Sequence, residues 1–354
     1  PSFDPGLAYD SGFLEYLGFL CDAEPSALSP TTCPSLESVG IPTDASDLNM
    51  ASIAVAELAG EQTVTRTVTS VANRTATWRV RVDAPRGYEA VVSPTEITLA
   101  PGESASYEVT FTATDAAPVG EWRFGSLTWR SQGGASAYSP IALRAQLFTA
   151  PSSVDGAGVD SSVGFDVTFG YSGDYTAAAH GLESAVVIED NVVQDPDQNF
   201  DPTDGFSNAH EFTTSGAAFV RFAMPPDAVP TADHDIDLFL FDSAGNQVAS
   251  STNGGTDEVI DVVLPADDTW TLYVHGWQTV DASADYTLYA WIVSATPGGN
   301  MTVDSAPASA TLGATETVDV SWTGAAAGEW HLGAVSHADA AGLIGLTLVE
   351  VDNR

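Results

Sequence analysis

The chain has 354 residues, of which 44% are hydrophobic, and its 48 Asp and Glu against 10 basic residues give a net charge of −38. Nucleic acid and anionic membranes are poor partners, because binding them requires clustered positive charge. No apolar run approaches the ~18 residues of a membrane-spanning helix. The chain is also too long for a single domain with one hydrophobic core. With 31 Gly, 20 Pro and recurrent Thr, Ser and Val, the composition predicts several all-β domains. The acidity suits an extracellular protein, although a composition bias of the lineage explains it equally well.

The first predicted element is an amphipathic helix within residues 10–21. Its apolar residues recur at helical spacing and share one face: Phe13, Leu17, Leu20 and Cys21. Asp10 or Ser11 is expected to cap the helix, and Glu15 lies near the positive end of its dipole. A single helix has nothing of its own to pack on, so we expect it to dock on a neighbouring domain.

Cys21 and Cys33 are the two cysteines of the chain. As a disulfide they would tie down the irregular segment 22–47, contribute about 3 kcal/mol and indicate an oxidising compartment. Two free buried thiols are the alternative.

Strand patterns begin near residue 53. Residues 63–71 set the apolar Val64, Val68 and Val71 against Thr residues and Arg66, and residues 77–82 alternate again. Turn signals follow at 85–87 and 100–103. This rhythm predicts half-buried antiparallel strands of a seven-stranded sandwich.

Seven segments in this order resemble the region that follows the catalytic serine in plant-type subtilases. They cover 3–10, 19–21, 33–34, 47–55, 63–69, 124–129 and 139–142. The resemblance implies that residues 1–50 end a peptidase domain and that 51–148 form a fibronectin type III-like sandwich. Met50 and Ala51 depart from the family, which more often has Tyr-Pro there.

Residues 149–184 are expected to be a linker with lead-in strands, and 190–208 an acidic, irregular stretch. Further strands are predicted near 217–222, 235–241, 259–264, 270–275 and 286–293, with a hairpin turn at 242–246. Segments 235–246, 271–276 and 286–288 are similar to the bacterial pre-peptidase C-terminal domain. That resemblance implies a jelly-roll-like accessory sandwich over 185–295, in a family whose relatives include calcium and fibrous-substrate binders.

A weak internal repeat closes the chain. Its first copy consists of residues 98–103 followed by Gly120-Glu121-Trp122. Its second copy consists of residues 311–316 followed by Gly328-Glu329-Trp330. Residues 296–354 are therefore predicted to be a further Ig-like element. Being too short to stand alone, it is expected to pack on residues 164–182.

The six histidines are the candidate bases for a hydrolytic site: His180, His210, His234, His275, His331 and His337. None lies in a His-Glu-x-x-His or Gly-x-Ser-x-Gly motif. Subtilases take their Asp, His and Ser motifs from sequence upstream of the matched region, and none of those motifs occurs here. We therefore assign no catalytic residue and expect the chain alone to hydrolyse no peptide bond.

Structural calcium is the one metal hypothesis, and no metal ligand or other cofactor residue is assigned. Carboxylates cluster at Asp233, Asp235, Asp237 and Asp242, with Asp235 and Asp237 on one strand face, and such oxygen ligands suit calcium. No EF-hand pattern is present, and strand-end carboxylates often bond turn amides instead. A second cluster, Asp195, Asp197 and Asp201, is interpreted as a solvated loop.

Aromatic platforms for sugars or peptides are a further hypothesis. The eight tryptophans are Trp78, Trp122, Trp129, Trp270, Trp277, Trp291, Trp322 and Trp330. Most of them lie in alternating strands, where core packing is expected. Trp277, in a predicted loop after His275, is the candidate for ligand contact.

Three functional hypotheses follow from these patterns. The favoured one is a non-catalytic accessory region of a secreted subtilisin-like serine endopeptidase, which stabilises the missing catalytic domain or positions a protein substrate. A free-standing carbohydrate- or protein-binding surface module and an independent hydrolase are the alternatives.

Overall fold

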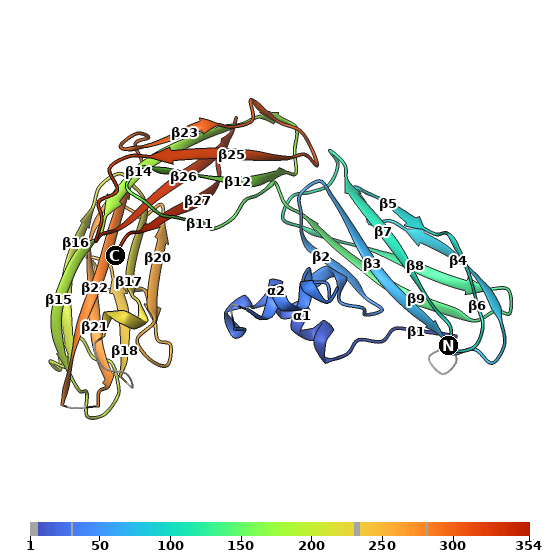
Figure 1. Cartoon of the computed structure of the whole chain (residues 1–354), viewed down its shortest axis with the longest axis horizontal. Helices are drawn as coiled ribbons and strands as arrows, with labels where there is room; N and C mark the ends of the chain where they lie inside the picture. The colour runs from blue at the N-terminus through green and yellow to red at the C-terminus, as the bar shows by residue number, and fades with distance from the viewer. Residues whose placement is uncertain (1–5, 30, 230–233, 281) are drawn as a thin grey trace. The chain divides into compact units, whose positions relative to one another are not determined.

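The computed structural model describes residues 6–29, 31–229, 234–280 and 282–354. It consists almost entirely of β-strands with a short helical N-terminal segment, so the predicted all-β sandwich class is confirmed (Figure 1). The chain divides into two compact units, one of 1–149, 167–174 and 309–315 and one of 150–166, 175–308 and 316–354. None of the helices within the described ranges is long and apolar enough to cross a membrane.

The first sandwich follows the alternation in the sequence. Neighbouring side chains on a strand point to opposite sides of the sheet, so every second residue enters the core, as the fully buried Trp78 and Trp129 do. The four-stranded sheet contains, in order, β1 (Leu7–Ala8), β3 (Glu61–Ser70), β7 (Ser104–Ala113) and β5 (Tyr88–Ser93). The five-stranded sheet contains β2 (Ile53–Leu58), β9 (Ser136–Ala145), β8 (Trp122–Ser131), β4 (Ala76–Asp83) and β6 (Glu96–Leu99).

Strand β3 corrects one detail of the sequence interpretation. Arg66, placed with the polar residues, lies on the buried side because it is two residues from both Val64 and Val68, and only 2% of it is exposed. Val71, expected on the apolar side, follows the end of β3 and is exposed.

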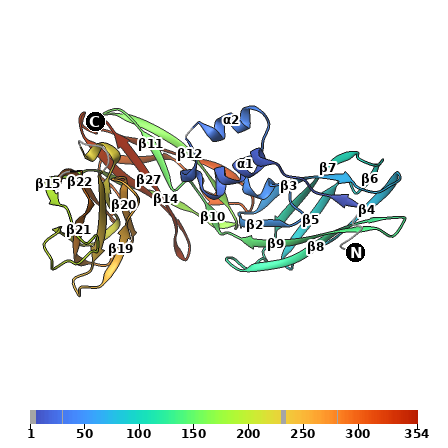
Figure 2. The ribbon, with the colours of Figure 1, turned by 90° about the horizontal axis from the view of Figure 1, so that it is seen from below.

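The N-terminal arm contains α1 (Phe13–Ala23), η1 (Pro25–Ala27), α2 (Thr32–Ser38) and η2 (Ala45–Asp47). Figure 2 shows α1 near β2 and β3, the two strands that η2 contacts. The arm therefore packs along one edge of the first sandwich.

The segments 149–184 and 296–354 together make a second sandwich. Its first sheet contains β10 (Phe148–Thr149), β12 (Ser161–Phe169), β25 (Thr315–Trp322) and β23 (Met301–Ser305). Its second contains β11 (Ser153–Gly156), β27 (Gly342–Asp352), β26 (Trp330–Asp339) and β14 (Thr176–Ser184). A short ladder joins β13 (Gly173–Asp174) to β24 (Ser309–Ala310). The C-terminal residues thus pair with strands near 164–182, as expected.

The second sandwich repeats the strand order of the first. Sheet β10-β12-β25-β23 matches β1-β3-β7-β5, and β11-β27-β26-β14 matches β2-β9-β8-β4. The match includes the parallel pairs β2 with β9 and β11 with β27. In both copies the tryptophan of the Gly-Glu-Trp repeat begins a strand, as Trp122 begins β8 and Trp330 begins β26. The weak sequence repeat thus marks equivalent strands of two related sandwiches.

A third sandwich, which we call the jelly roll, interrupts the second between β14 and β23. The first sandwich has only the residues 84–87 at the equivalent place, between β4 and β5. One sheet contains β15 (Val186–Val193), β22 (Ser283–Ser294), β17 (Ala217–Met224) and β20 (Glu258–Val263). The other contains β16 (Ser207–Thr214), β21 (Asp268–Gln278), β18 (Asp235–Phe241) and β19 (Gln247–Ser251). A 3-10 turn, η3 (Pro226–Ala228), follows β17. Because β15 pairs with β22, the ends of this inserted sandwich lie together.

The jelly roll packs against the outer face of the β14-β26-β27 sheet. The contact is a continuous buried apolar cluster drawn from β17 and β22 on one side and β26 and β27 on the other. Its members are Phe219, Ala223, Trp291, Val293, Leu332, Ala334 and Leu348. An ion pair between Arg221 and Glu350 lies beside the cluster. The second sandwich therefore uses this sheet face as a protein interface.

Candidate functional site

The helix α1 begins later than expected, after an N-cap at Gly12. Ser11 is not the cap, because its hydroxyl donates to the Asn49 carbonyl at 2.8 Å, and the Asp10 carbonyl accepts from the Asn49 side chain. The predicted caps are therefore wrong, since both residues are used to hold the arm to the segment around Asn49. Glu15 instead accepts a hydrogen bond from the Gly12 amide at 2.9 Å and stabilises the first turn.

The apolar side of α1 is partly uncovered. Phe13 is 75% exposed, and Leu14 and Tyr16 are also exposed, whereas Leu17 is half-buried. Of the predicted apolar face, Phe13 is exposed whereas Leu17 and Leu20 are half-buried, and the exposed patch is completed by Leu14 and Tyr16. Of the described helix residues only Gly18 is buried, against the Pro42 carbonyl. The helix therefore presents apolar side chains that no described residue covers.

A disulfide joins Cys21 and Cys33, whose Cα atoms are 5.8 Å apart. The bond links the end of α1 to α2, so the predicted pairing is confirmed. It restrains the presentation of the exposed α1 residues by closing the loop between the helices.

Hydrogen bonds along the β3 edge hold the arm to the first sandwich. Asp47 accepts from the Thr65 amide at 2.7 Å, and the Asn49 side chain pairs with both backbone groups of Thr67. Arg66 reaches through the sandwich to donate to the Met50 carbonyl at 2.9 Å and to those of Ser52 and Thr65. Sequence reasoning gave Arg66 and Asn49 no role, because their acceptors and donors are backbone groups that leave no residue pattern.

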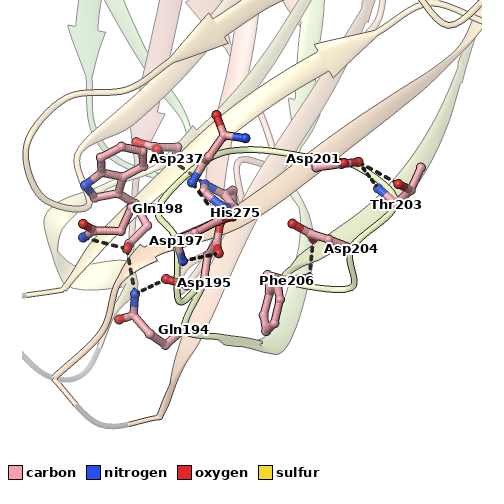
Figure 3. Close-up of polar contacts among 12 residues, drawn as sticks. Gln194, Asp195, Asp197, Gln198, Asp201, Thr203, Asp204, Phe206, Asp237 and His275 are labelled. Atoms are coloured by element: carbon pink, nitrogen blue, oxygen red, sulfur yellow. Dashed lines mark hydrogen bonds and ion pairs between the residues drawn. The ribbon is translucent and has the colours of Figure 1, made fainter.

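The jelly roll contains a buried histidine between two carboxylates (Figure 3). His275 on β21 is fully buried, with its Nε2 2.9 Å from Asp195 Oδ2 and its Nδ1 3.6 Å from Asp237 Oδ2. Asp237 lies on the neighbouring strand β18, and Asp195 comes from the segment after β15. We call these three residues the histidine cluster.

The electrostatics of the cluster favour an ion pair. Burial lowers the pKa of His275, but the negative charges of Asp237 and Asp195 and the hydrogen bond to Asp195 outweigh it, so that the pKa is raised. Burial by itself would raise the pKa of Asp195, but hydrogen bonds from His275 and from two backbone amides lower that pKa overall. Nearby Glu258 is also fully buried, and burial raises its pKa to about 7. The histidine cluster thus holds charge that its surroundings would otherwise exclude.

The geometry of the histidine cluster suits structure rather than nucleophilic catalysis. Both imidazole nitrogens face carboxylates, and no described Ser, Thr or Cys side chain hydrogen-bonds to His275. Asp195 also accepts from the amides of Asp197 and Asn199 at 3.0 Å. The cluster therefore fixes the segment that follows Asp195.

That segment, residues 194–206, corrects the interpretation of a solvated loop. Phe200 stacks on Phe239 with ring centroids 3.9 Å apart, and it packs edge-on against His275. Asp197 and Asp201 are exposed, but Asp195 is 1% exposed because it pairs with the buried imidazole. Residues 194–206 form a strap over the outer face of β18 and β21, which the acidic composition concealed. The flanking residues, also expected to be irregular, belong to β15 and β16.

The remaining histidines have polar neighbours of other kinds. These are Ser294 and Ser336 for His180, Tyr286 for His210, the Val280 amide for His234, Glu329 for His331, and Tyr175 with Thr347 for His337. Burial lowers the pKa of His337 to about 4, so this histidine is neutral near pH 7. His180 with Ser336 is a serine–histidine contact, but a backbone carbonyl rather than a carboxylate orients the imidazole. No carboxylate–histidine–serine triad is formed by the described residues.

The aspartate cluster proposed for calcium is dispersed. Asp233 lies outside the described residues, Asp235 accepts from the Gly255 amide, and Asp242 accepts from the Ala244 and Asn246 amides of the hairpin turn. Among the residues that the structure describes, no group of three or more His, Cys, Asp or Glu is placed to hold a metal ion. These carboxylates serve turns and the histidine cluster.

Tryptophan positions follow the expectation of core packing for Trp78, Trp129, Trp270, Trp291 and Trp322, which are buried. Trp122 is exposed on β8. Trp277 lies on β21 rather than in a loop, with its ring 6.3 Å from His275, so the predicted loop position is wrong. The strand runs on to Gln278 because it pairs with β18 as far as Asp235.

Comparison with known proteins assigns the first sandwich. A family model described as a fibronectin type-III domain matches residues 47–143. Two Arabidopsis thaliana proteins match a longer stretch: subtilisin-like protease SBT3.16 is 33% identical over 153 residues, and subtilisin-like protease SBT2.5 is 32% identical over 143. Residues 47–143 are thus a fibronectin type III-like domain, in a chain that is similar over about 40% of its length to subtilisin-like proteases.

The subtilase matches cover 41% and 40% of this chain but only 19% and 17% of the two relatives. The chain thus spans about a fifth of the length of these subtilases. Among solved structures, one match is to the secreted serine protease VesC from Vibrio cholerae. The match covers 68% of this chain and 48% of the VesC chain, at 11% sequence identity and a TM-score of 0.22.

Proposed function

We propose that this chain is the non-catalytic accessory region of a secreted subtilisin-like serine endopeptidase. The fibronectin type III-like domain and the similarity to subtilisin-like proteases support the assignment, and α1 supplies the observation that carries it. A short helix tied by a disulfide and by β3-edge hydrogen bonds, yet exposing Phe13, Leu14 and Tyr16, suits a docking element for a domain outside this chain. The occupant we propose is the linked peptidase domain.

The role of this contact is to stabilise the peptidase domain, to position a protein substrate, or both. Residues 185–295 act in this proposal as a pre-peptidase C-terminal-type domain, an idea supported by their jelly-roll pair of four-stranded sheets. Secretion is supported by the Cys21–Cys33 disulfide, because such bonds persist in oxidising compartments.

The test begins with the sequence encoded upstream of Pro1. A peptidase domain with Asp, His and Ser motifs is expected there, whereas a secretion signal directly before Pro1 would favour a free-standing surface module. In the full polypeptide, Phe13→Ser with Leu14→Ser should shorten the half-life of casein hydrolysis at elevated temperature. Val91→Ser, which alters an exposed apolar residue on the outer face of the four-stranded sheet, is the matched control. Equal half-lives in both variants would contradict α1 docking.

A further inference from the structure

The five-stranded sheet of the first sandwich has an outer face with a counterpart in the second sandwich. The pairing of β8 with β9 has the same register as that of β26 with β27. The corresponding residues are Trp122 and Trp330, Phe124 and Leu332, Tyr138 and Leu346, and Pro140 and Leu348. The two faces can therefore be compared position by position.

In the second sandwich this face is covered by protein. Leu332 is 1% exposed and Leu348 6% exposed, because both pack on the jelly roll. The equivalent positions in the first sandwich are open, since Phe124 is 74% exposed and Tyr138 is 61% exposed. One fold thus uses the same sheet face twice, once with its protein partner in the chain and once without.

The open face belongs to the part of this acidic chain that carries most of its positive charge. Eight of the ten arginines lie in residues 51–150, against nine Asp and Glu, while residues 151–354 contain two arginines and 31 acidic residues. Arg79 and Arg81 on β4 and Arg130 on β8 are exposed, at alternate positions that point outward. We call these three arginines with Trp122, Phe124 and Tyr138 the arginine-aromatic face.

Two of the arginines are placed against each other. Arg79 lies directly opposite Arg130 in the β4–β8 register, a like-charge pair that costs stability. Glu96 pairs with Arg79, but no described carboxylate pairs with Arg81 or Arg130. Like charges held together on an exposed sheet favour a partner that brings carboxylates.

The other outer face of the same sandwich has a different character. It is lined by hydroxyl pairs that satisfy one another across β3 and β7, such as Thr63 with Thr110 and Thr67 with Ser106, each at 2.8 Å. The hydroxyl groups of that surface therefore already have hydrogen-bond partners. The contrast within one domain sets the arginine-aromatic face apart from an ordinary solvated sheet.

The aromatic residues favour protein over saccharide as the occupant. Arg144 covers the Trp122 ring, with its guanidinium carbon 5.2 Å from the ring centroid, so this ring is not open for stacking on a sugar. Phe124, the most exposed ring of the face, has no polar group and suits an apolar pocket. Exposed aromatics beside arginines are the residues that anchor protein interfaces.

We propose that the arginine-aromatic face is a docking surface for an acidic polypeptide, with Phe124 as its apolar anchor and Arg81 and Arg130 as its charge-reading residues. The charges are reversed relative to the second sandwich, whose covered sheet face supplies the carboxylate of Glu350 to Arg221 of the jelly roll. This surface goes beyond the proposed accessory role, because it does not involve α1 or a peptidase domain.

The test measures binding of a fluorescein-labelled peptide of Glu-Val repeats to this chain at low salt, by fluorescence anisotropy. We expect saturable binding that a Gln-Val peptide lacks and that Arg81→Ser with Arg130→Ser weakens about tenfold. Phe124→Ser should weaken it similarly. The controls are Arg74→Ser with Arg86→Ser, in turns of the same domain, and Val91→Ser on the opposite face. These should bind as the unaltered chain does.

Four results would overturn the proposal. One is no binding of the Glu-Val peptide, and another is an equal loss of binding in the control variants. The third is preference for polygalacturonate, which would assign the face to an acidic saccharide. Sedimentation equilibrium checks a second copy as occupant, since a dimer lost in Phe124→Ser would assign the face to self-association. All of these readouts use the chain alone, so they are independent of whether α1 docks on a peptidase.

Discussion

The first sandwich and the jelly roll bury charged groups in different ways. In the first sandwich, Arg66 donates to backbone carbonyls, and its pKa is lowered mainly by burial. In the jelly roll, His275 lies between two carboxylates, and Glu258 is buried nearby. The first arrangement holds a chain segment at any ordinary pH, because arginine does not lose its charge. The second depends on pH, since the pKa values of His275, Asp195 and Glu258 are shifted by their surroundings.

The two regions differ outside as well as inside. The fibronectin domain is almost neutral and presents arginines, whereas the jelly roll and its host sandwich are strongly acidic. Self-repulsion keeps acidic surfaces apart, so a nearly neutral domain is the part of the chain best suited to contacts with acidic partners.

Arg66→Met gives the sharpest test of this comparison. The change leaves the Met50 and Ser52 carbonyls without their buried donor and should destabilise the first sandwich by about 3 kcal/mol. Denaturant unfolding monitored by tryptophan fluorescence measures the loss, which should be the same at pH 5 and pH 8. Arg86→Met, at an exposed turn, is the control and should change little. A loss below about 1 kcal/mol would mean that the arm is held without Arg66.

Glu258 should make the stability of the jelly roll depend on pH, in contrast to the contribution of Arg66 to the first sandwich. Its folded pKa of about 7 exceeds its ordinary value of 4.5, so the folded state holds the proton more tightly. This stabilisation is complete below the ordinary pKa and is lost as pH rises through the folded pKa, by about 3 kcal/mol in all. The raised pKa of His275 adds a further loss of stability at higher pH. The lowered pKa of Asp195 has its effect only at acid pH, where stability falls as pH falls.

Glu258→Gln isolates this effect, because glutamine keeps the acceptor that binds the Asn253 amide. The free energy of unfolding of this variant should be nearly constant between pH 5 and pH 7. Denaturant unfolding of the second unit, which contains the jelly roll, measures it. A decline as steep as that of the unaltered chain would show that another group is responsible.

The sequence predicted the strands better than the buried polar groups, for a physical reason. Alternation and turn residues are local, so β4, β18 and the 242–246 hairpin lie where they were expected. His275 and Asp195 are 80 positions apart, and only folding brings them together. The Cys21–Cys33 pair was predictable because a chain with two cysteines offers one internal pairing. The uncovered side of α1 was only partly predictable, since helical spacing does not tell which residues the arm covers.

Phe200→Ala should loosen the strap without disturbing the two sheets. Loss of the stacked contact with Phe239 is expected to cost about 1–2 kcal/mol and to speed amide exchange in residues 194–206. Phe124→Ala is the matched control, because its exposed ring has no core contact to lose. Unchanged exchange in the strap would indicate that Asp195 alone holds it.

Calcium should have the smallest effect of all. Asp235 already accepts from the Gly255 amide at 3.2 Å, and Asp242 is occupied by the hairpin turn, so their oxygens are engaged with backbone donors. We expect added calcium or excess chelator to leave the melting temperature within about 1 °C, because an ion that gains little from folded over unfolded protein shifts stability little. Asp235→Asn keeps the acceptor for Gly255 and should change stability by less than about 0.5 kcal/mol. A calcium-dependent rise of several degrees that disappears in Asp235→Asn would contradict this view. The acidic unit would then have to be regarded as an ion-stabilised module, in contrast to the fibronectin domain, whose buried charge needs no ion.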